Sequence, residues 1–178
     1  MKLSADAEAR YQTQDYSKRP GIDGVALVDV RRFHDESGSM TELVRLEEGR
    51  VKGLEGFVAV QLNFSTLEPG AIKAFHVHRR QTDVWFVPPS DRVLLLLVDT
   101  RQGSPTEGNR LRFTLGDGES RLVRIPPGVA HGCRNVGTAA ARILYLTDLH
   151  FSAVPQETDE GRLPWDHFGA GLWEPIRD

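Results

Sequence analysis

The feature that most constrains this chain is a series of short apolar runs, each stopped within a few residues by Gly, Pro, Asp, Asn or Ser. No long helical period appears between the runs, which is typical of strands joined by turns. The run at 93–98 (VLLLLV) is apolar throughout and predicts a strand buried on both faces. The series therefore predicts an all-β sandwich or barrel. The runs lie at 25–30, 57–64, 84–87, 93–98, 111–115, 120–125 and 141–147.

The two ends of the chain depart from this pattern. Residues 1–19 are polar and predict a frayed or weakly helical arm. Residues 155–178 combine charge, glycine, Trp165 and Trp173, and predict a tail that carries a short helix or wraps the barrel. A chain of 178 residues suits a single domain. We therefore expect an N-terminal arm over 1–19 and one β-barrel domain with its tail over 20–178.

Composition excludes several classes of function. A formal net charge of −3 gives no electrostatic reason to bind nucleic acid or an anionic membrane. Cys133 is the single cysteine, so no internal disulfide can form, and an intracellular compartment is favoured. No apolar run reaches the roughly 18 residues of a membrane span, and the N-terminus is polar where a secretion signal would be apolar. We expect a cytoplasmic protein that binds a small molecule.

Two clusters of residues have the spacing of metal ligands. His76 and His78 lie two apart, so in a strand both side chains point to one face, and a following turn can bring Asp83 beside them. Further along, a Pro-x-Gly turn precedes His131, which then enters the next strand. Three imidazoles and a carboxylate suit Fe, Mn, Ni, Cu or Zn. The alternative is a set of polar pocket residues that hold no metal.

These clusters resemble the two sequence motifs of the cupin superfamily. The first runs from Gly70 through the histidine pair to Asp83, and the second runs from Pro126 through His131 to Asn135. The cupin pattern has Glu where this chain has Asp83, and its glycine lies closer to the following Pro. The resemblance implies a double-stranded β-helix, the cupin jelly roll, with short helical or irregular termini. Cupins that keep such residues include many that bind no metal.

A more extensive resemblance covers residues 22–174. The dTDP-4-dehydrorhamnose 3,5-epimerase family, itself a cupin-fold family, carries a series of short motifs, and the chain is similar to them in the same order. This resemblance implies an epimerase or isomerase that acts on a nucleotide-linked 4-keto-deoxysugar. The matching segments are FHDESG at 33–38 with Glu42, QLNFS at 61–65, GAIKAFH at 70–76, VDTR at 98–101, SPTEG at 104–108, IPPGVAHG at 125–132 and YLT at 145–147.

Epimerisation beside a keto group needs a base, a group that stabilises the enolate oxygen, and an acid on the opposite face of the carbon. The resemblance places the base at His76, and it places Lys73 where the family has a phosphate-binding Arg. The family's Lys, which supports the oxyanion, aligns with Asp83, whose carboxylate would repel an enolate. The family's acid is a Tyr just after 145–147, where His150 is the nearest titratable side chain, and the Asp that partners the base has no clear match. These departures predict a divergent member with His150 as the proton shuttle.

A bound divalent metal would replace the missing positive charge as a Lewis acid. Held by His76, His78, Asp83 and His131, it would occupy the lone pair of His76. Three hypotheses therefore stand: the sugar epimerase, a metal-dependent cupin enzyme such as a dioxygenase or isomerase acting on a small polar molecule, and a non-catalytic sugar-binding cupin. No organic cofactor is expected.

Further polar residues are candidates for binding a nucleotide sugar. Arginine suits bidentate diphosphate contacts, but Arg79 and Arg80 are adjacent, so at most one points inward from a strand. Arg101 could contact the substrate or a neighbouring subunit. The family resemblance also implies a homodimer, with N-terminal strands exchanged or packed between subunits. The expected substrate-binding residues are Gln61, Asn63, Lys73, Arg79, Gln81 and Arg101.

Overall fold

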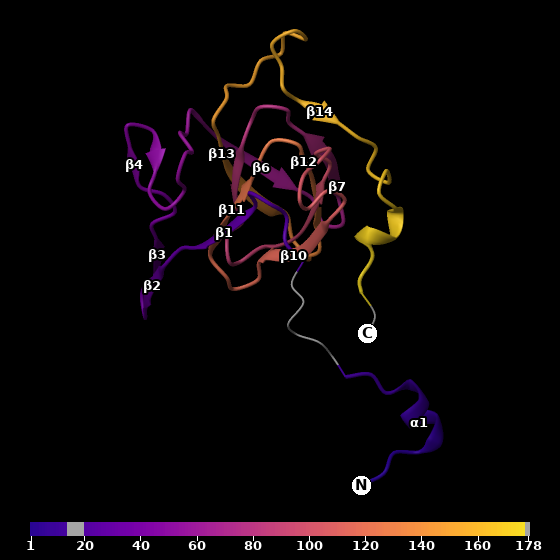
Figure 1. The fold of residues 1–178 in the computed structure, drawn as a ribbon. Coiled ribbons are helices and arrows are strands. Elements are labelled where there is room, and N and C mark those ends of the chain that lie inside the picture. The colour runs from indigo at the N-terminus through magenta and orange to yellow at the C-terminus, as the bar shows by residue number, and fades with distance from the viewer. Residues whose placement is uncertain (14–19, 177–178) are drawn as a thin grey trace.

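Two five-stranded antiparallel sheets face each other in the computed structural model, which describes residues 1–13 and 20–176 (Figure 1). In each sheet most neighbouring strands are distant in sequence, as in a jelly roll, so the predicted all-β cupin fold is confirmed. The first sheet has the order β1 (Ala26–Asp29), β11 (Arg121–Ile125), β8 (Asp83–Phe86), β13 (Ala141–Thr147), β6 (Gln61–Leu67). The second has the order β10 (Arg110–Gly116), β9 (Arg92–Asp99), β12 (Val129–Asn135), β7 (Ile72–Val77), β14 (Gly161–Arg162).

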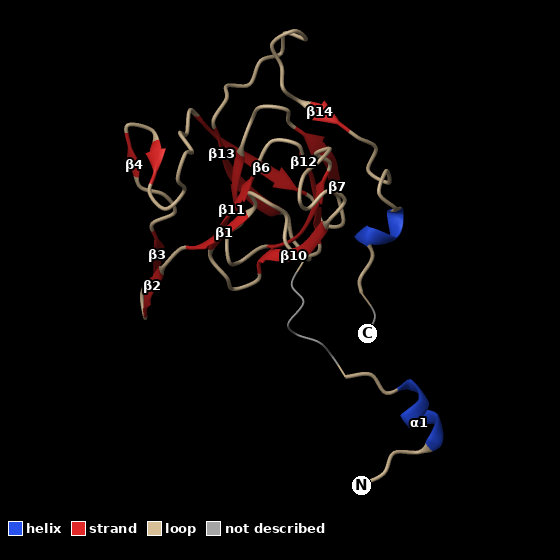
Figure 2. Ribbon diagram, in the orientation of Figure 1, coloured by secondary structure: helices blue, strands red, loops and turns tan. Residues whose placement is uncertain are grey.

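Two short hairpins lie outside these sheets (Figure 2). One pairs β2 (Arg32–Asp35) with β3 (Gly38–Thr41), and the other pairs β4 (Leu46–Glu47) with β5 (Arg50–Val51). The helices are α1 (Ala5–Arg10), which buries none of its residues, and the 3-10 helix η1 (Ala170–Trp173). Residues 14–19 of the predicted arm lie outside the described residues. Across the described part of the chain, every helix is too short or too polar to cross a membrane.

Six of the seven apolar runs coincide with strands, and the run at 57–64 is the exception. Its strand, β6, begins only at Gln61. The residues before it leave the sheet because Phe57 is buried in a hydrophobic cluster against the outer face of the first sheet. The backbone N–H of Ala59 instead donates to the carbonyl of Gly49, 2.7 Å away, beside the β4–β5 hairpin.

The strand β9 is buried on both faces, as its all-apolar sequence predicts. Val93, Leu95 and Leu97 face the core between the two sheets. Its alternate residues lie on the outer face, in a cluster with Phe75 and Trp173 of the C-terminal tail. The tail fits closely there because Gly132 carries no side chain: a Cβ would lie 2.4 Å from the Cβ of Ala74 and 2.9 Å from the ring of Trp173.

Candidate active site

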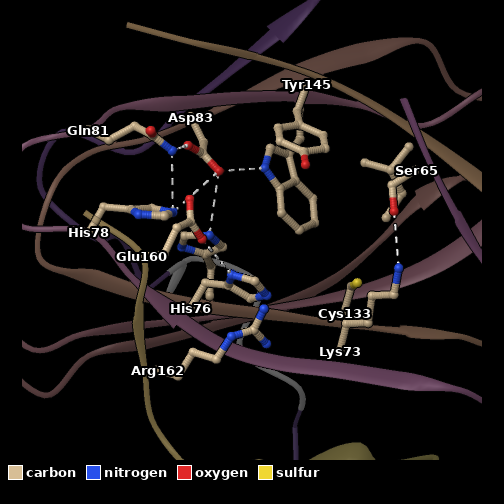
Figure 3. Close-up of a pocket in the computed structure, with 13 residues that line it drawn as sticks. Ser65, Lys73, His76, His78, Gln81, Asp83, Cys133, Tyr145, Glu160 and Arg162 are labelled. Carbon is tan, nitrogen blue, oxygen red and sulfur yellow. Dashed lines mark hydrogen bonds and ion pairs between the residues drawn. The ribbon is translucent and has the colours of Figure 1, made fainter. Parts of the chain in front are cut away.

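A cavity of about 320 Å³ lies between the two sheets and contains most of the polar residues that the sequence singled out (Figure 3). Side chains from both sheets and from the C-terminal segment line it. The lining residues are Ser65, Lys73, His76, His78, Gln81, Asp83, Trp85, His131, Cys133, Ile143, Tyr145, Glu160 and Arg162.

His78, Asp83 and His131 form the buried centre of the cavity, and each is less than 5% exposed. The Nε2 atoms of His78 and His131 lie 3.8 and 3.5 Å from Oδ2 of Asp83. The Nδ1 atom of His78 lies 2.8 Å from the carbonyl of Asp159, and that of His131 lies 3.1 Å from the carbonyl of Val129. Because a carbonyl only accepts hydrogen bonds, each Nδ1 atom is the donor in its contact. The Nε2 atoms of both rings are directed at the same carboxylate.

The Asp83 carboxylate is held by further donors. Nε2 of Gln81 donates to Oδ1 at 2.8 Å, and Nε1 of Trp85 donates to Oδ2 at 3.0 Å. Burial alone would raise the pKa of Asp83, but hydrogen bonding and charge from His131, with the charge of His78 and the bond from Trp85, lower this pKa to about 2. Asp83 is thus ionised at neutral pH, with all of its partners fixed in place.

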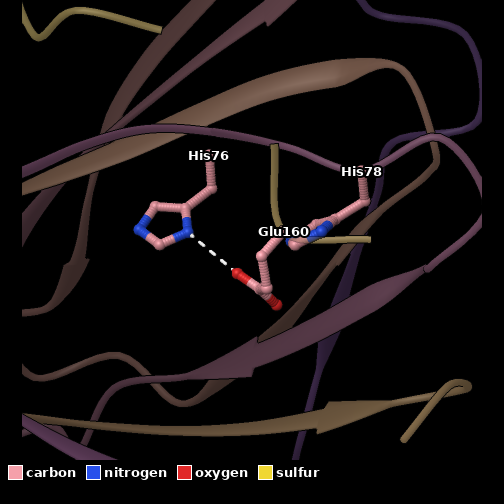
Figure 4. A group of neighbouring side chains, drawn as sticks. All are labelled: His76, His78 and Glu160. Atoms are coloured by element: carbon pink, nitrogen blue, oxygen red, sulfur yellow. Dashed lines mark ion pairs between the residues drawn. The ribbon is translucent and has the colours of Figure 1, made fainter. Parts of the chain in front are cut away.

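His76 faces a different carboxylate (Figure 4). Its Nδ1 lies 3.5 Å from Oε2 of Glu160. Glu160 immediately precedes β14, which pairs with β7 and sets Arg162 opposite His76. Burial lowers the pKa of His76 to about 3, with further lowering by His131 and Arg162. The ring therefore stays neutral near pH 7, and its Nε2 lone pair can accept a proton.

The four predicted metal ligands thus fall into two groups among the described residues. One donor atom from each of His78, Asp83 and His131 lies within 4.8 Å of the others, whereas His76 groups with His78 and Glu160. Three ligands that open onto a cavity are typical of a catalytic metal site. A metal held by His78, Asp83 and His131 would not need His76 as a ligand, so it would not conflict with a role of His76 as the base.

Tyr145 reaches the cavity from the sheet opposite to that of His76. It lies on β13, across from Trp85 of β8, with the two rings 6.0 Å apart. Burial raises the pKa of Tyr145, and the charges of Asp83 and Glu160 raise it further, so the hydroxyl stays protonated. We expected the acid after this strand, whereas strand alternation turns Ile143 and Tyr145 of the strand itself toward the cavity.

His150, the predicted proton shuttle, does not join this group. It follows the end of β13, is exposed, and is not among the described residues that line the cavity. Glu160 and Arg162 line the cavity instead, although neither belongs to any of the sequence motifs described above. Their position depends on the pairing of β14 with β7, more than 80 residues apart in sequence, which no local pattern reveals.

Some of the predicted substrate-binding residues line the cavity and others do not. Lys73 and Gln81 line the cavity, and Nζ of Lys73 donates to Oγ of Ser65 at 3.1 Å. Gln61 and Asn63 share the inward-facing side of β6 with Ser65, but neither lines the cavity. Nε2 of Gln61 donates a hydrogen bond to Oδ1 of Asn63 at 2.8 Å. The neighbouring thiol, Cys133, also lines the cavity. Burial raises the pKa of this thiol to about 12, so it is not a nucleophile at neutral pH.

Arg79 and Arg101 lie outside the main cavity. Arg79 is exposed and lines a separate cavity of about 370 Å³ beside β14. Nε of Arg101 donates to the carboxylate of Asp99 at 2.8 Å, and its Nη2 donates to the carbonyl of Asp23 at 2.7 Å. The hydrogen bond from Arg101 holds the pKa of Asp99 well below its usual range. Arg101 thus links Asp23, near the start of the domain, to Asp99 at the end of β9, and its side chain does not line the main cavity.

Comparisons with known proteins agree with this geometry. A family model described as dTDP-4-dehydrorhamnose 3,5-epimerase matches residues 19–168. The spore coat polysaccharide biosynthesis protein SpsL of Bacillus subtilis is 39% identical over 145 residues, which cover 82% of this chain and 91% of that protein. A dTDP sugar isomerase from Desulfovibrio desulfuricans superposes with a TM-score of 0.72 at 27% identity, over 88% of this chain and 91% of the other. An epimerase from Legionella pneumophila, solved in complex with dTDP-4-keto-L-rhamnose, gives 0.64 at 27% identity, over 74% and 70%.

These matches confirm the prediction of a carbohydrate epimerase that was made from the motifs. The family model spans both sheets and the segment that carries Glu160 and Arg162, so it includes every residue that lines the cavity. The chain belongs to the dTDP-4-dehydrorhamnose 3,5-epimerase family.

Proposed function

We propose that the protein inverts a carbon next to the keto group of a nucleotide-linked 4-keto-deoxysugar, with His76 as the base and Tyr145 as the acid. One observation carries this proposal: a neutral imidazole and a protonated phenol enter one cavity from opposing sheets. Nε2 of His76 takes the carbon-bound proton, and the electron pair moves onto the keto oxygen to give an enolate. The Tyr145 hydroxyl then donates its proton to the opposite face of the carbon.

Glu160 supports the base in this scheme. When His76 accepts a proton it becomes an imidazolium, and the Glu160 carboxylate lies 3.5 Å from its Nδ1. The negative charge stabilises the imidazolium and fixes the orientation of the ring. Catalytic hydrogen bonds are often long before substrate binds, so this contact is expected to shorten in the complex. Lys73 and Arg162, the two cations that line the cavity, are the groups available to a diphosphate.

The enolate oxygen needs a positive partner, because Asp83 occupies the position of the family's Lys. The arrangement of His78, Asp83 and His131 fits a divalent ion, because one donor atom from each of the three buried side chains lies within 4.8 Å of the others. These three residues would hold Fe, Mn, Ni or Zn, and the bound ion would supply Lewis acidity at the keto oxygen. The same triad supports a second candidate function, a metal-dependent cupin enzyme that acts on a small polar molecule.

Solvent exchange tests the main proposal. The protein, loaded with Mn²⁺, Fe²⁺ or Zn²⁺ in turn, is incubated in D₂O with a dTDP-4-keto-6-deoxyhexose, and deuterium incorporation is followed by mass spectrometry. We expect incorporation by the wild type and none by His76→Asn. Oxygen consumption with bound iron and no exchange would support the second candidate instead. Thermal stabilisation by the nucleotide sugar, with neither exchange nor oxygen uptake, would indicate a non-catalytic sugar-binding protein.

We also propose that the protein acts as a homodimer. Leu62 and Phe64 are each 63% exposed on the outer face of β6, which is the last strand of the first sheet in the structure as described. In the β2–β3 hairpin, Phe33 lies opposite Met40, and both side chains are exposed. Exposed apolar groups on a sheet edge and on a projecting hairpin favour burial against a second copy. Light scattering after gel filtration measures the assembly state directly.

A further inference from the structure

The turn that joins β7 to β8 directs three backbone N–H groups at one carboxylate. Oδ1 of Asp159 accepts from the N–H of Arg79 at 3.1 Å, and Oδ2 accepts from those of Arg80 and Gln81, both at 2.8 Å. Successive N–H groups that converge in this way form an anion-binding nest. The anion here is a side chain that lies 78 to 80 residues further along the sequence. Its side chain is only 10% exposed.

Asp159 makes a second contact with the same turn through its backbone. Its carbonyl accepts from Nδ1 of His78 at 2.8 Å, which fixes the ring whose Nε2 is directed at Asp83. The C-terminal segment thus contacts both ends of the turn, His78 and Gln81, and the side chain of Gln81 in turn donates to Asp83.

The residue that follows Asp159 is Glu160. On its C-terminal side the segment is anchored by the pairing of β14 with β7 and by two backbone hydrogen bonds between Leu163 and Phe75, of 2.9 and 3.0 Å. On its N-terminal side the anchor is Asp159. Neighbouring residues of an extended chain point in opposite directions, so Asp159 enters the nest while Glu160 faces His76.

We infer that Asp159 is a positioning residue: by filling the nest at 79–81 it sets the Glu160 carboxylate against His76. This inference rests on the proposed role of His76 as the base. Without the Asp159 carboxylate the N-terminal side of the segment loses its three hydrogen bonds to the turn and keeps the one from His78 to the Asp159 carbonyl, so Glu160 is held less closely against Nδ1 of His76. The expected loss is in the rate of proton abstraction, with little change in the KM of the sugar nucleotide.

A double-mutant cycle on the full-length protein tests this inference. Glu160→Gln and Asp159→Ala should each lower kcat for deuterium exchange by about 10- to 100-fold, the usual effect of removing a group that orients a site residue. If Asp159 acts through Glu160, adding Asp159→Ala to the Glu160→Gln protein should lower kcat no further. Asp159→Asn keeps the side-chain volume and takes the place of the alanine variant if that protein does not fold.

Asp91→Ala is the matched control. Asp91 is another largely buried carboxylate that accepts a backbone N–H, from Arg142 at 2.7 Å, but it lines a different cavity. The Asp91→Ala variant should have a lower melting temperature, and its kcat measured below that temperature should equal that of the wild type. Losses that multiply in the double variant, or a kcat loss of equal size in Asp91→Ala, would overturn the role given to Asp159. A wild type without any exchange would instead refute the proposed function, and this inference with it.

Discussion

Trp173 closes the outer face of the second sheet, and its replacement by alanine offers a direct measure of what the C-terminal tail contributes. Its side chain is 1% exposed, its ring lies 5.3 Å from that of Phe75, and its Nε1 donates to the carbonyl of Trp165 at 2.8 Å. Removing a buried aromatic side chain of this size costs about 3–5 kcal/mol. Losing the hydrogen bond adds about 1 kcal/mol. We therefore expect the free energy of unfolding to fall by about 4–6 kcal/mol.

Urea denaturation followed by circular dichroism measures this difference, and Trp165→Ala is its control. Trp165 is 48% exposed, and the group that contacts Trp173 is its backbone carbonyl, which the alanine variant keeps. Trp165→Ala should cost less than about 1 kcal/mol. If Trp173→Ala cost no more than Trp165→Ala, the tail would not be packed on the sheet, and our account of how it carries Glu160 to the site would be wrong.

Three further predictions follow from the site and the surface. Tyr145→Phe should slow formation of the inverted product by about 10²–10⁴-fold, whereas deuterium exchange at the carbon facing His76 should persist, as NMR of the product would reveal. The pKa of folded Asp99 is lowered from 3.8, so its contribution to stability is present above that value and is lost as the pH falls below it; melting temperatures between pH 3 and 7 should therefore vary less in Asp99→Asn than in the wild type. Leu62→Asp with Phe64→Asp should give a monomer by light scattering, and a dimer of unchanged stability would refute the proposed interface.

Much of the fold follows from the short apolar runs and period-two patterns of the sequence, because the strands that carry these runs bury at least one face fully or in part. The same alternation placed His76 and His78 on one side of a strand, and the cavity indeed receives both, together with Asp83 and His131. The strand predicted over 57–64 begins too early, because an apolar sequence does not distinguish a strand from a segment that packs against one. Phe57 belongs to a segment that packs on the outer face of the first sheet.

What the sequence could not predict depends on contacts between distant segments. Glu160 and Arg162 lie in a polar tail, and the pairing of β14 with β7, together with the contacts of the residues that flank it, brings them to the cavity. The two candidates for the acid differ in position: matching a family by short motifs leaves an uncertainty of a few residues, and Tyr145 on the strand itself lines the cavity. His150, five residues later, is exposed.

The order of strands in the first sheet has a consequence for how the chain reaches its native state. β1 pairs with β11 so that Ala26 lies beside Arg124, a separation of 124 − 26 = 98 residues. Contacts between such distant residues form slowly, and folding dominated by them takes milliseconds to seconds. Until the core and the C-terminal tail have packed on it, the apolar run of β9 is uncovered on both faces, and an uncovered run of high β propensity is prone to self-association. Yield on refolding should therefore fall steeply as protein concentration rises, and cooler, more dilute conditions should favour the native barrel.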